Sequence, residues 1–385
     1  MPLRIVVAPD KFKGSLSARA AAEAIGRGIA RALPDAQLDL VPVADGGDGT
    51  AETIVQSLGG TMVAKTVRGP DGKPVHAHYG LLPGGSVAVI ELAAASGLAL
   101  VPAARNDPLT ASTFGTGELI SDAIDAGAKR IILGIGGSAT SDAGAGALSA
   151  LGAVFLDGAH HALGPGGAPL ARLAAIDTSA LDKRLRGVSI EIASDVRNPL
   201  CGPSGASAVY GPQKGASPED VRVLDGALRN FADVAQAKVG IDVRDVPGAG
   251  AAGGTAAGFL ALARATLRPG AELVLEVLDF ERHLAGANLV VTGEGRLDRQ
   301  TMAGKAPYAV AAAARARGIP VVAIAGSVDC PPEDLEAASI AFAVPIVAGP
   351  MTVEDAMDRA ADLAADAAEM LGRALALGWQ VGRGE

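Results

Sequence analysis

Short runs of branched apolar residues alternate with alanine- and leucine-rich stretches of helical length along most of this chain. Such alternation is typical of a mostly parallel sheet flanked by helices. The expected strands are 4–8, 38–43, 130–133, 189–193, 289–292 and 321–325, and the expected helices are 18–33, 118–126, 144–151, 218–239 and 307–317. Thr352 and Asp355 form a capping-box pattern that begins a further helix, from 353 to about 377. We therefore predict an α/β fold.

Three strand-like segments, 61–67, 75–82 and 86–90, interrupt this alternation and are joined by Pro-Asp-Gly and Pro-Gly-Gly turns. Tight turns connect antiparallel strands, so these segments predict an inserted domain. A length of 385 residues fits two domains of roughly 150 residues or more. We place a discontinuous Rossmann-like parallel-sheet domain at 1–65 and 284–385, and an inserted mixed α/β domain at 66–283. Residues 112–155 fit either domain.

The charge and composition argue against several classes of protein. The net charge is −9, aromatic residues make up 3% of the chain and no basic patch is visible, so we do not expect a nucleic-acid partner. Cys201 and Cys330 lie far apart, and the five histidines add no metal-binding spacing. No apolar run reaches the ~18 residues that cross a membrane, and the first residues lack a signal-peptide core. We therefore predict a cytoplasmic protein that does not bind a membrane.

Glycines, hydroxyls and carboxylates follow five of the predicted strands, at 9–15, 44–50, 134–142, 194–199 and 293–298. In open α/β sheets, ligands bind outside the carboxyl ends of the strands. Glycine turns let backbone N–H groups approach a phosphate, and carboxylates nearby can hold Mg²⁺. The basic residues close to these turns could neutralise a phosphoryl group; they are Lys13, Arg197, Lys214, Arg296 and Lys305.

Two nucleotide-binding sequence patterns were compared with these turns. Gly304-Lys305 is not a Walker A motif, because the glycine required five positions before Gly304 is replaced by Arg299. Gly134, Gly136 and Ala139 fit the dinucleotide fingerprint, and Asp157 lies near the spacing of its ribose-binding acid. An NAD(P)-dependent dehydrogenase of a small hydroxy acid and a non-catalytic small-acid binding protein therefore remain alternatives to a kinase.

Several of the polar residues also have a purely structural interpretation. Asp142 and Thr50 could be helix caps, and Asp45 and Asp48 could serve only a glycine-rich turn. Asp195 could cap its loop. These interpretations stay open beside the functional ones.

Seven segments, taken in order, resemble motifs of the bacterial glycerate kinases of family type 1, the glycerate 2-kinases. They are APDKFKGSL at 8–16, ADGGDGT at 44–50, GGSAT at 136–140, SDVRNPL at 194–200, YGPQKGA at 210–216, GAAGG at 250–254 and GEGRLDRQT at 293–301. The resemblance extends from about residue 3 to about residue 373. It implies a two-domain protein that transfers the γ-phosphoryl group of ATP to D-glycerate, with Mg²⁺, to give 2-phosphoglycerate and ADP. Glycerate is then the expected small-molecule partner, and the oligomeric state is not indicated.

We assign hypothetical roles to the acceptor-side residues at the matched positions. Asp195 is expected to orient or deprotonate the acceptor hydroxyl. Lys13 and Arg197 are expected to bind the glycerate carboxylate or the transferring phosphoryl group. The further substrate-binding residues expected are Asp10, Ser15, Asn198 and Arg296.

The donor side is assigned in the same way. Nucleotide contacts are expected from the two glycine turns, at Gly136, Gly137, Ser138, Ala139, Thr140, Gly293, Glu294 and Gly295. Carboxylates near these turns are expected to hold Mg²⁺; they are Asp45, Asp48 and Asp298.

Overall fold

The computed structural model describes residues 3–102, 106–299, 301 and 304–383. The chain divides into two compact units. Unit 1 comprises Met1–Asp45 and Ala271–Glu385, and unit 2 is the continuous segment Gly46–Gly270. A discontinuous unit with a second one inserted into it is the arrangement that the sequence predicts. No helix within the described residues is long and apolar enough to cross a membrane.

Unit 1 is built on a five-stranded sheet in which every pair of neighbouring strands is parallel. The strand order is β15 (Phe342–Pro345), β13 (Val321–Ala325), β11 (Leu289–Gly293), β1 (Arg4–Pro9) and β2 (Gln37–Leu40). From β1 the chain continues to β2 on one side, and from β11 it continues to β13 on the other. The strand order therefore reverses between β1 and β11, and such a switch point is where open α/β sheets bind ligands.

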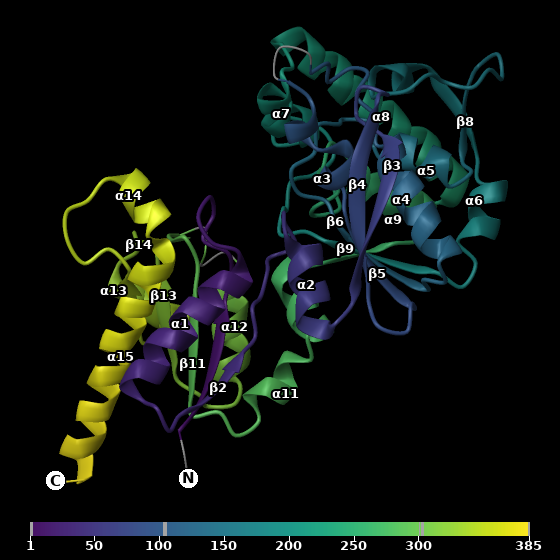
Figure 1. The fold of residues 1–385 in the computed structure, drawn as a ribbon. Helices are drawn as coiled ribbons and strands as arrows, with labels where there is room; N and C mark the ends of the chain where they lie inside the picture. The colour runs from purple at the N-terminus through teal and green to yellow at the C-terminus, as the bar shows by residue number, and fades with distance from the viewer. Residues whose placement is uncertain (1–2, 103–105, 300, 302–303, 384–385) are drawn as a thin grey trace. The chain divides into compact units, whose positions relative to one another are not determined.

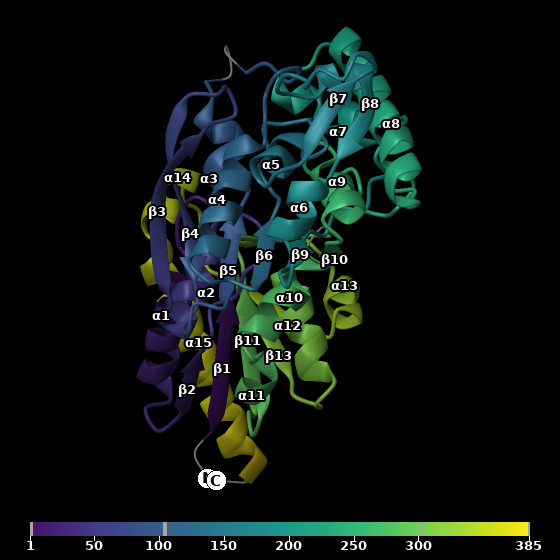
Figure 2. The ribbon, with the colours of Figure 1, turned by 90° about the vertical axis from the view of Figure 1, so that its right-hand side faces the viewer.

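Helices α1 (Ala18–Ala32) and α15 (Ala360–Arg383) lie side by side in unit 1 (Figures 1 and 2). Ser17 caps α1 by accepting a hydrogen bond from the backbone N–H of Ala20. The two helices pack closely at Gly28, where a β-carbon would lie 2.0 Å from the carbonyl oxygen of Ala365. The other helices of this unit are α10 (Gly270–Val277), which starts at the last residue of unit 2, α11 (Phe280–Leu284), α12 (Ala306–Arg315), α13 (Pro332–Ala337) and α14 (Val353–Asp358).

Unit 2 contains a six-stranded mixed sheet (Figure 2). Its order is β10 (Thr266–Arg268), β9 (Ser189–Ala193), β6 (Arg130–Gly134), β5 (Val87–Glu91), β4 (Pro74–Leu81) and β3 (Thr61–Arg68). The first four strands are parallel, whereas β4 runs antiparallel to both β5 and β3. This confirms the predicted fold class, including the antiparallel segments in the inserted domain.

The helices of unit 2 pack around a core that contains Tyr79, Leu133, Phe155, Phe231 and Phe259. The rings of Phe155 and Phe231 are 6.4 Å apart between centroids. The helices are α2 (Thr50–Leu58), α3 (Ala93–Ser96), α4 (Phe114–Asp125), α5 (Ala145–Ala150), α6 (Ser179–Arg184), α7 (Ala206–Tyr210), α8 (Pro218–Val239) and α9 (Thr255–Leu262).

The unit boundaries differ from the positions expected near residues 65 and 283. Strand β3 pairs along its whole length with β4, so it belongs to the sheet of unit 2. The segment 112–155, which the sequence left unassigned, lies wholly within unit 2. Thr352 is the N-cap that the sequence predicts and accepts a 3.1 Å hydrogen bond from Asp355 N, but the Asp355 carboxylate accepts from the Thr352 hydroxyl and not from its backbone N–H, as a capping box requires. The expected helix also breaks at Arg359 into α14 and α15.

Candidate functional site

The switch point of unit 1 carries a buried aspartate. Asp10 follows β1 and is 4% exposed, and its Oδ1 accepts a hydrogen bond of 2.6 Å from the backbone N–H of Lys11. Burial raises the pKa of Asp10 to about 7, and repulsion from Asp45 and then Glu294 adds to the rise. A carboxyl group near neutrality is therefore placed where a ligand of this sheet would bind.

Glu294 follows β11 on the other side of the same switch point and is 8% exposed. Its Oε1 accepts a 2.5 Å hydrogen bond from the Thr301 hydroxyl, and its Oε2 lies 3.9 Å from the Lys305 ammonium nitrogen. Burial raises the pKa of Glu294, and Asp45 and Asp298 contribute to the rise. Unit 1 therefore brings together four of its acids: Asp10, Asp45, Glu294 and Asp298.

Gly295 allows the loops after β1 and β11 to approach each other, since a β-carbon there would lie 3.0 Å from the backbone nitrogen of Lys13. At Gly293, the last residue of β11, a β-carbon would lie 1.8 Å from the carbonyl oxygen of Ile324 in the neighbouring strand β13. Close backbone approach is the role expected of such glycines. The structure thus places the predicted segments 10–15 and 293–295 next to each other.

The polar side chains of these two loops have different surroundings. Lys13 is exposed, whereas the Ser15 hydroxyl donates to the carbonyl oxygen of Phe12 at 3.1 Å. Arg296 is exposed and forms ion pairs with Asp298, at 3.6 Å, and with Asp329.

In unit 2, the predicted phosphate turn, residues 136–140, follows strand β6. Gly136 and Gly137 are exposed, whereas Ser138, Ala139 and Thr140 are buried. Gly137 has φ +68°, and a β-carbon there would lie 3.2 Å from Asp48 Oδ1. The turn is held by hydrogen bonds from Leu98 N to Gly137 O and from Ala139 N to Ser96 O, both 2.9 Å. The exposed end of the turn is therefore glycine alone, which leaves its backbone open to a ligand.

Lys214 is buried, at 2% exposure, and its side chain contacts the buried residues of this turn. Its ammonium group donates to the Ser138 hydroxyl at 2.9 Å and to the carbonyl oxygen of Thr140 at 2.5 Å. Burial lowers the pKa of Lys214 to about 8, and the nearby Asp142 partly opposes that shift. The sequence indicated Lys214 only as a basic residue near a turn. Its burial beneath the turn depends on tertiary packing.

Asp142 serves as a structural cap, in agreement with one of the two interpretations left open. It is fully buried, and its Oδ2 accepts hydrogen bonds from the backbone N–H and hydroxyl of Thr113, both at 2.8 Å. It also accepts from the N–H groups of Gly144 and Gly146, at 3.1 and 3.2 Å, at the start of α5.

The loop after β9 carries Asp195, Arg197 and Asn198. Asp195 is exposed, and its Oδ1 accepts a 2.9 Å hydrogen bond from Gly270 N. Arg197 is exposed as well. The Asn198 side chain is held by its contacts with the carbonyl oxygen of Ser204 and the Tyr210 hydroxyl, both at 2.8 Å. Asp195 and Arg197 are therefore accessible, whereas the Asn198 side chain is already hydrogen-bonded within the protein.

Glu91, at the end of β5, is a residue that the sequence interpretation missed. Its carboxylate accepts hydrogen bonds from Gly49 N at 3.1 Å and from Ala51 N at 2.8 Å, and so holds the start of α2 and the turn that contains Asp48. The rule that carboxylates follow strand ends would have identified it, had residues 86–90 been included among those strands.

The predicted metal ligands do not form a preformed cage. Within the described residues, no three histidine, cysteine, aspartate or glutamate side chains converge to hold a metal ion. Asp45 and Asp298 belong to unit 1, and Asp48 belongs to unit 2. Mg²⁺ is usually held through one or two carboxylates together with water and substrate phosphates. The mutually repelling acids of unit 1 fit this smaller requirement.

Asp157 does not occupy the position that the dinucleotide fingerprint requires. It ends β7 (Val154–Asp157), which pairs antiparallel with β8 (Leu173–Asp177) in a separate two-stranded sheet. Its Oδ1 accepts hydrogen bonds from Ala159 N and His161 N, both 2.9 Å, within the turn that follows. A ribose-binding acid would end the parallel strand next to the glycine turn. This part of the dehydrogenase alternative is therefore wrong.

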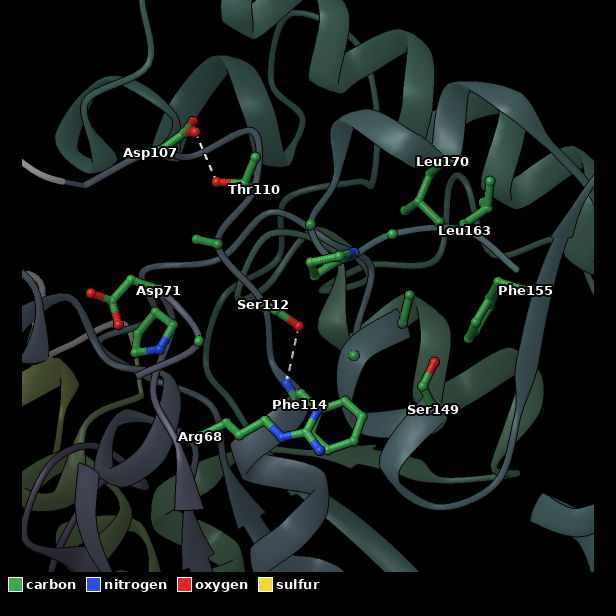
Figure 3. A pocket seen from close by; sticks show the side chains of 18 of the residues that line it. Arg68, Asp71, Asp107, Thr110, Ser112, Phe114, Ser149, Phe155, Leu163 and Leu170 are labelled. Atoms are coloured by element: carbon green, nitrogen blue, oxygen red, sulfur yellow. Dashed lines mark hydrogen bonds between the residues drawn. The ribbon is translucent and has the colours of Figure 1, made fainter. Parts of the chain in front are cut away.

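A pocket of about 820 Å³ lies in unit 2 and was also missed; we call it the loop pocket. Figure 3 shows Phe155, Leu163 and Leu170 on one side of it and Asp71 and Asp107 on the other. The Arg68 guanidinium lies over the Phe114 ring, 4.0 Å from its centroid. Because its walls come from loops far apart in the sequence, no local motif could have indicated it.

Glycine turns and carboxylates at the carboxyl ends of parallel strands, without a Walker A sequence, define an α/β protein of a class suited to phosphorylated ligands. Within that class, this chain belongs to the glycerate kinase family, whose model matches residues 5–376.

Individual relatives agree with the family match. The chain is 49% identical to a glycerate kinase of Bacillus subtilis, over 94% of each chain. It is 49% identical to the glycerate 2-kinase of Escherichia coli, over 84% of this chain and 85% of the relative. A crystal structure assigned as glycerate kinase 2 of Salmonella typhimurium matches with a TM-score of 0.91 and 46% identity, over 99% of this chain and 100% of the other.

Proposed function

We propose that this chain catalyses ATP-dependent phosphorylation of D-glycerate to 2-phosphoglycerate, with ADP as the second product. The observation that carries the proposal is the identity of 49% to the glycerate 2-kinase of Escherichia coli over most of both chains. The two alternatives, a dehydrogenase and a non-catalytic binding protein, have no comparable support among the relatives. The cytoplasmic location expected from the sequence stays a prediction.

The donor phosphates are proposed to bind at residues 136–140. The exposed backbone at Gly136 and Gly137 and the buried charge of Lys214 support this assignment. Backbone N–H groups and a fixed cation stabilise negative charge without reorganisation during the reaction. A contribution from Gly293, Glu294 and Gly295 to nucleotide binding stays a prediction.

On the acceptor side, Asp195 is proposed to accept the proton of the glycerate 2-hydroxyl. The hydroxyl oxygen then bonds to the γ-phosphorus, and the bond from that phosphorus to the bridging oxygen of ADP breaks. The exposure of Asp195 and Arg197 at a strand end supports such roles. The substrate contacts assigned to Lys13, Asp10, Ser15, Asn198 and Arg296 stay predictions.

Mg²⁺ is proposed to be held through Asp45 and Asp298, whose charge contributes to the raised pKa of Glu294. When bound, the ion would neutralise the charge on the nucleotide phosphates. A role for Asp48 as a further Mg²⁺ ligand stays a prediction. Its side chain lies beside Gly137 in the turn at residues 136–140.

A coupled assay of ADP release across a panel of small hydroxy acids tests this function. We expect release that depends on D-glycerate and Mg²⁺, and phosphorus NMR should identify the product as 2-phosphoglycerate rather than its 3-phospho isomer. Hydride transfer to NAD(P)⁺ without ADP release would favour the dehydrogenase. Binding of glycerate in calorimetry without turnover would favour the binding protein.

A further inference from the structure

We propose that the loop pocket of unit 2 binds the nucleoside end, the purine base and ribose, of the phosphoryl donor. This inference rests on the proposed function, because it names where the uncharged part of the same nucleotide lies. The phosphates themselves are assigned to the turn at residues 136–140.

The position of the loop pocket agrees with this role. Strands β3 and β5 both run antiparallel to β4, and β6 runs parallel to β5, so β3, β5 and β6 point the same way. The pocket is lined by residues 68–72, which begin at the last residue of β3, by Val101 and residues within 106–114, which follow β5, and by residues of α5, which follows β6. It therefore lies at the carboxyl ends of three strands, where α/β sheets bind ligands.

The size and charge of the loop pocket select the ligand. Ligand pockets for small molecules and cofactors span roughly 300–1,000 Å³, and this one measures about 820 Å³. Arg68 is already paired with Glu118, at 3.6 Å, and Asp71 is paired with Lys73, at 2.9 Å. Asp107 adds a carboxylate that accepts hydrogen bonds from Leu109 N and from the Thr110 hydroxyl. Carboxylates repel phosphates but accept hydrogen bonds from hydroxyl groups. A neutral sugar with a base fits this charge better than a triphosphate.

One side of the loop pocket is apolar and the other carries carboxylates, which suits a nucleoside with its flat base and its hydroxyl-bearing ribose (Figure 3). Phe155, Leu163 and Leu170 offer an apolar surface, and the Phe114 ring with the Arg68 guanidinium offers a planar one. Aromatic and guanidinium faces bind bases by stacking. The carboxylates on the opposite side are placed to accept from ribose hydroxyls.

Asn106 adds an unused acceptor to the lining. Its side-chain nitrogen donates to the carbonyl oxygen of Lys214 at 2.5 Å. Its Oδ1 is buried and has no hydrogen-bond partner among the residues that the structure describes. A buried acceptor without a donor is costly, and an exocyclic amine on a base would satisfy it.

The same residue joins the loop pocket to the phosphate turn. Asn106 contacts Lys214, and the Lys214 ammonium donates to Ser138 and to Thr140. A second link runs from Gly146, in the lining, to Asp142, directly after the turn. One nucleotide can therefore place its nucleoside in the pocket and direct its phosphates toward residues 136–140.

Filling the loop pocket tests the inference. Ser149 lines it from α5, so Ser149→Trp should occupy the space meant for the nucleoside. Ser57→Trp, at an exposed position of α2, is the matched control. Adenosine is the probe, because it carries no phosphate and its binding needs no turnover. In calorimetry, the wild type and Ser57→Trp should bind adenosine, and Ser149→Trp should bind it at least tenfold more weakly.

Kinetics of the same proteins provide a second readout. Ser149→Trp should raise the KM for ATP at least tenfold and leave the KM for glycerate within twofold of the wild type. A second variant, Phe114→Leu, keeps an apolar side chain but removes the aromatic face. It should weaken the binding of adenosine at least about fivefold. It keeps the test decisive if Ser149→Trp fails to fold, as judged by circular dichroism.

The inference is overturned if adenosine does not bind the wild type, or if Ser149→Trp and Phe114→Leu, both folded, bind it as well as the wild type does. Failure of the proposed function looks different: the wild type would release no ADP with glycerate, whatever adenosine does. Adenosine binding that is lost in Ser149→Trp, without kinase activity, would support the pocket and contradict the proposed function.

Discussion

The buried ammonium group of Lys214 makes the stability of the protein depend on pH. Its ammonium group donates hydrogen bonds to two neutral oxygens, those of Ser138 and Thr140, and burial lowers its pKa to about 8 from a normal 10.5. Between these two pH values the unfolded chain keeps the proton that the folded protein has lost. The unfolded state then binds more protons, so the free energy of unfolding rises with pH.

We therefore expect a Lys214-dependent gain in stability of about 3 kcal/mol between pH 8 and pH 10.5, at about 1.4 kcal/mol per pKa unit. Urea unfolding gives the free energy of unfolding of the wild type and of Lys214→Met at each pH across this range. Plotted against pH, this free energy should rise more steeply for the wild type than for Lys214→Met. Lys183→Met, at an exposed lysine, should give the wild-type slope. Equal slopes for the wild type and Lys214→Met would contradict a depressed pKa at Lys214.

At the same scale, Asp195 is the residue whose loss should most reduce the chemical step. Asp195→Asn keeps an acceptor for the Gly270 N–H but removes the proposed base, so turnover should fall by about 100-fold or more. The KM for ATP should change little. Asp35→Asn, at an exposed position of unit 1, serves as the control. Wild-type turnover in folded Asp195→Asn would remove this residue from the mechanism.

Residues were predictable from the sequence where local pattern decides their place. Asp10, Gly136, Asp195 and Glu294 lie one or two residues after a strand, and a strand end locates them without knowledge of the packing. The burial of Lys214 and the exposure of Lys13 depend on how helices and loops fold over the sheets. For the same reason, no sequence spacing distinguished Asp142 as a cap from Asp142 as a ligand.

At the scale of elements, the close contact between α1 and α15 requires a glycine, which has no side chain, at position 28. A β-carbon on Gly28 would lie 2.0 Å from the Ala365 carbonyl oxygen and 2.8 Å from the Ala368 β-carbon, so the helices would have to separate. Gly28→Ala should therefore destabilise the protein by about 1–3 kcal/mol, as overpacking does. Thermal unfolding followed by circular dichroism measures the shift.

Gly226 provides the matched control, since it is exposed in the middle of α8 and a β-carbon there meets nothing within 4 Å. Gly226→Ala should stabilise the protein by about 0.5–1 kcal/mol through helix propensity alone. If both substitutions shifted the melting temperature in the same direction, close packing at Gly28 would not be the cause.

Most strands and helices could be predicted because hydrophobic period and turn residues act locally. The hairpins of β3, β4 and β5 were expected from their Pro-Asp-Gly and Pro-Gly-Gly turns. The hairpin of β7 and β8 was not, because Val154–Asp157 has the same pattern as a strand of the parallel sheet. The predicted unit boundaries differ from the observed ones for a related reason. The strands with which a strand pairs, and not its composition, decide to which sheet it belongs.

At the scale of the whole molecule, the sheet of unit 1 depends on strands from both ends of the chain. Strand β1 lies between β2 and β11, and Thr292 Oγ1 donates to the carbonyl oxygen of Ala8 at 2.8 Å across 284 positions of sequence. A chain that ends at Gly270 would keep β1 and β2 but lose β11, β13 and β15. The apolar faces of β1 and α1 would then be uncovered.

We expect the truncated chain 1–270 to yield a protease-resistant product that corresponds to residues 46–270, with the first 45 residues digested. Limited proteolysis followed by mass spectrometry of the products measures this. The full-length protein should protect residues 4–40 under the same conditions. Protection of those residues in the truncated chain would mean that unit 1 does not need its C-terminal strands.

The pairing of β1 with β11 also sets an order of events during synthesis. When the ribosome has made the first 45 residues, their strand partner is still more than 240 residues away. At about 5–20 residues per second, the nascent segment waits for roughly 10–50 seconds before β11 emerges. The inserted unit can fold during that delay, whereas α1 and β1 keep apolar surface exposed. This interval is when the growing chain is most open to chaperones and to aggregation.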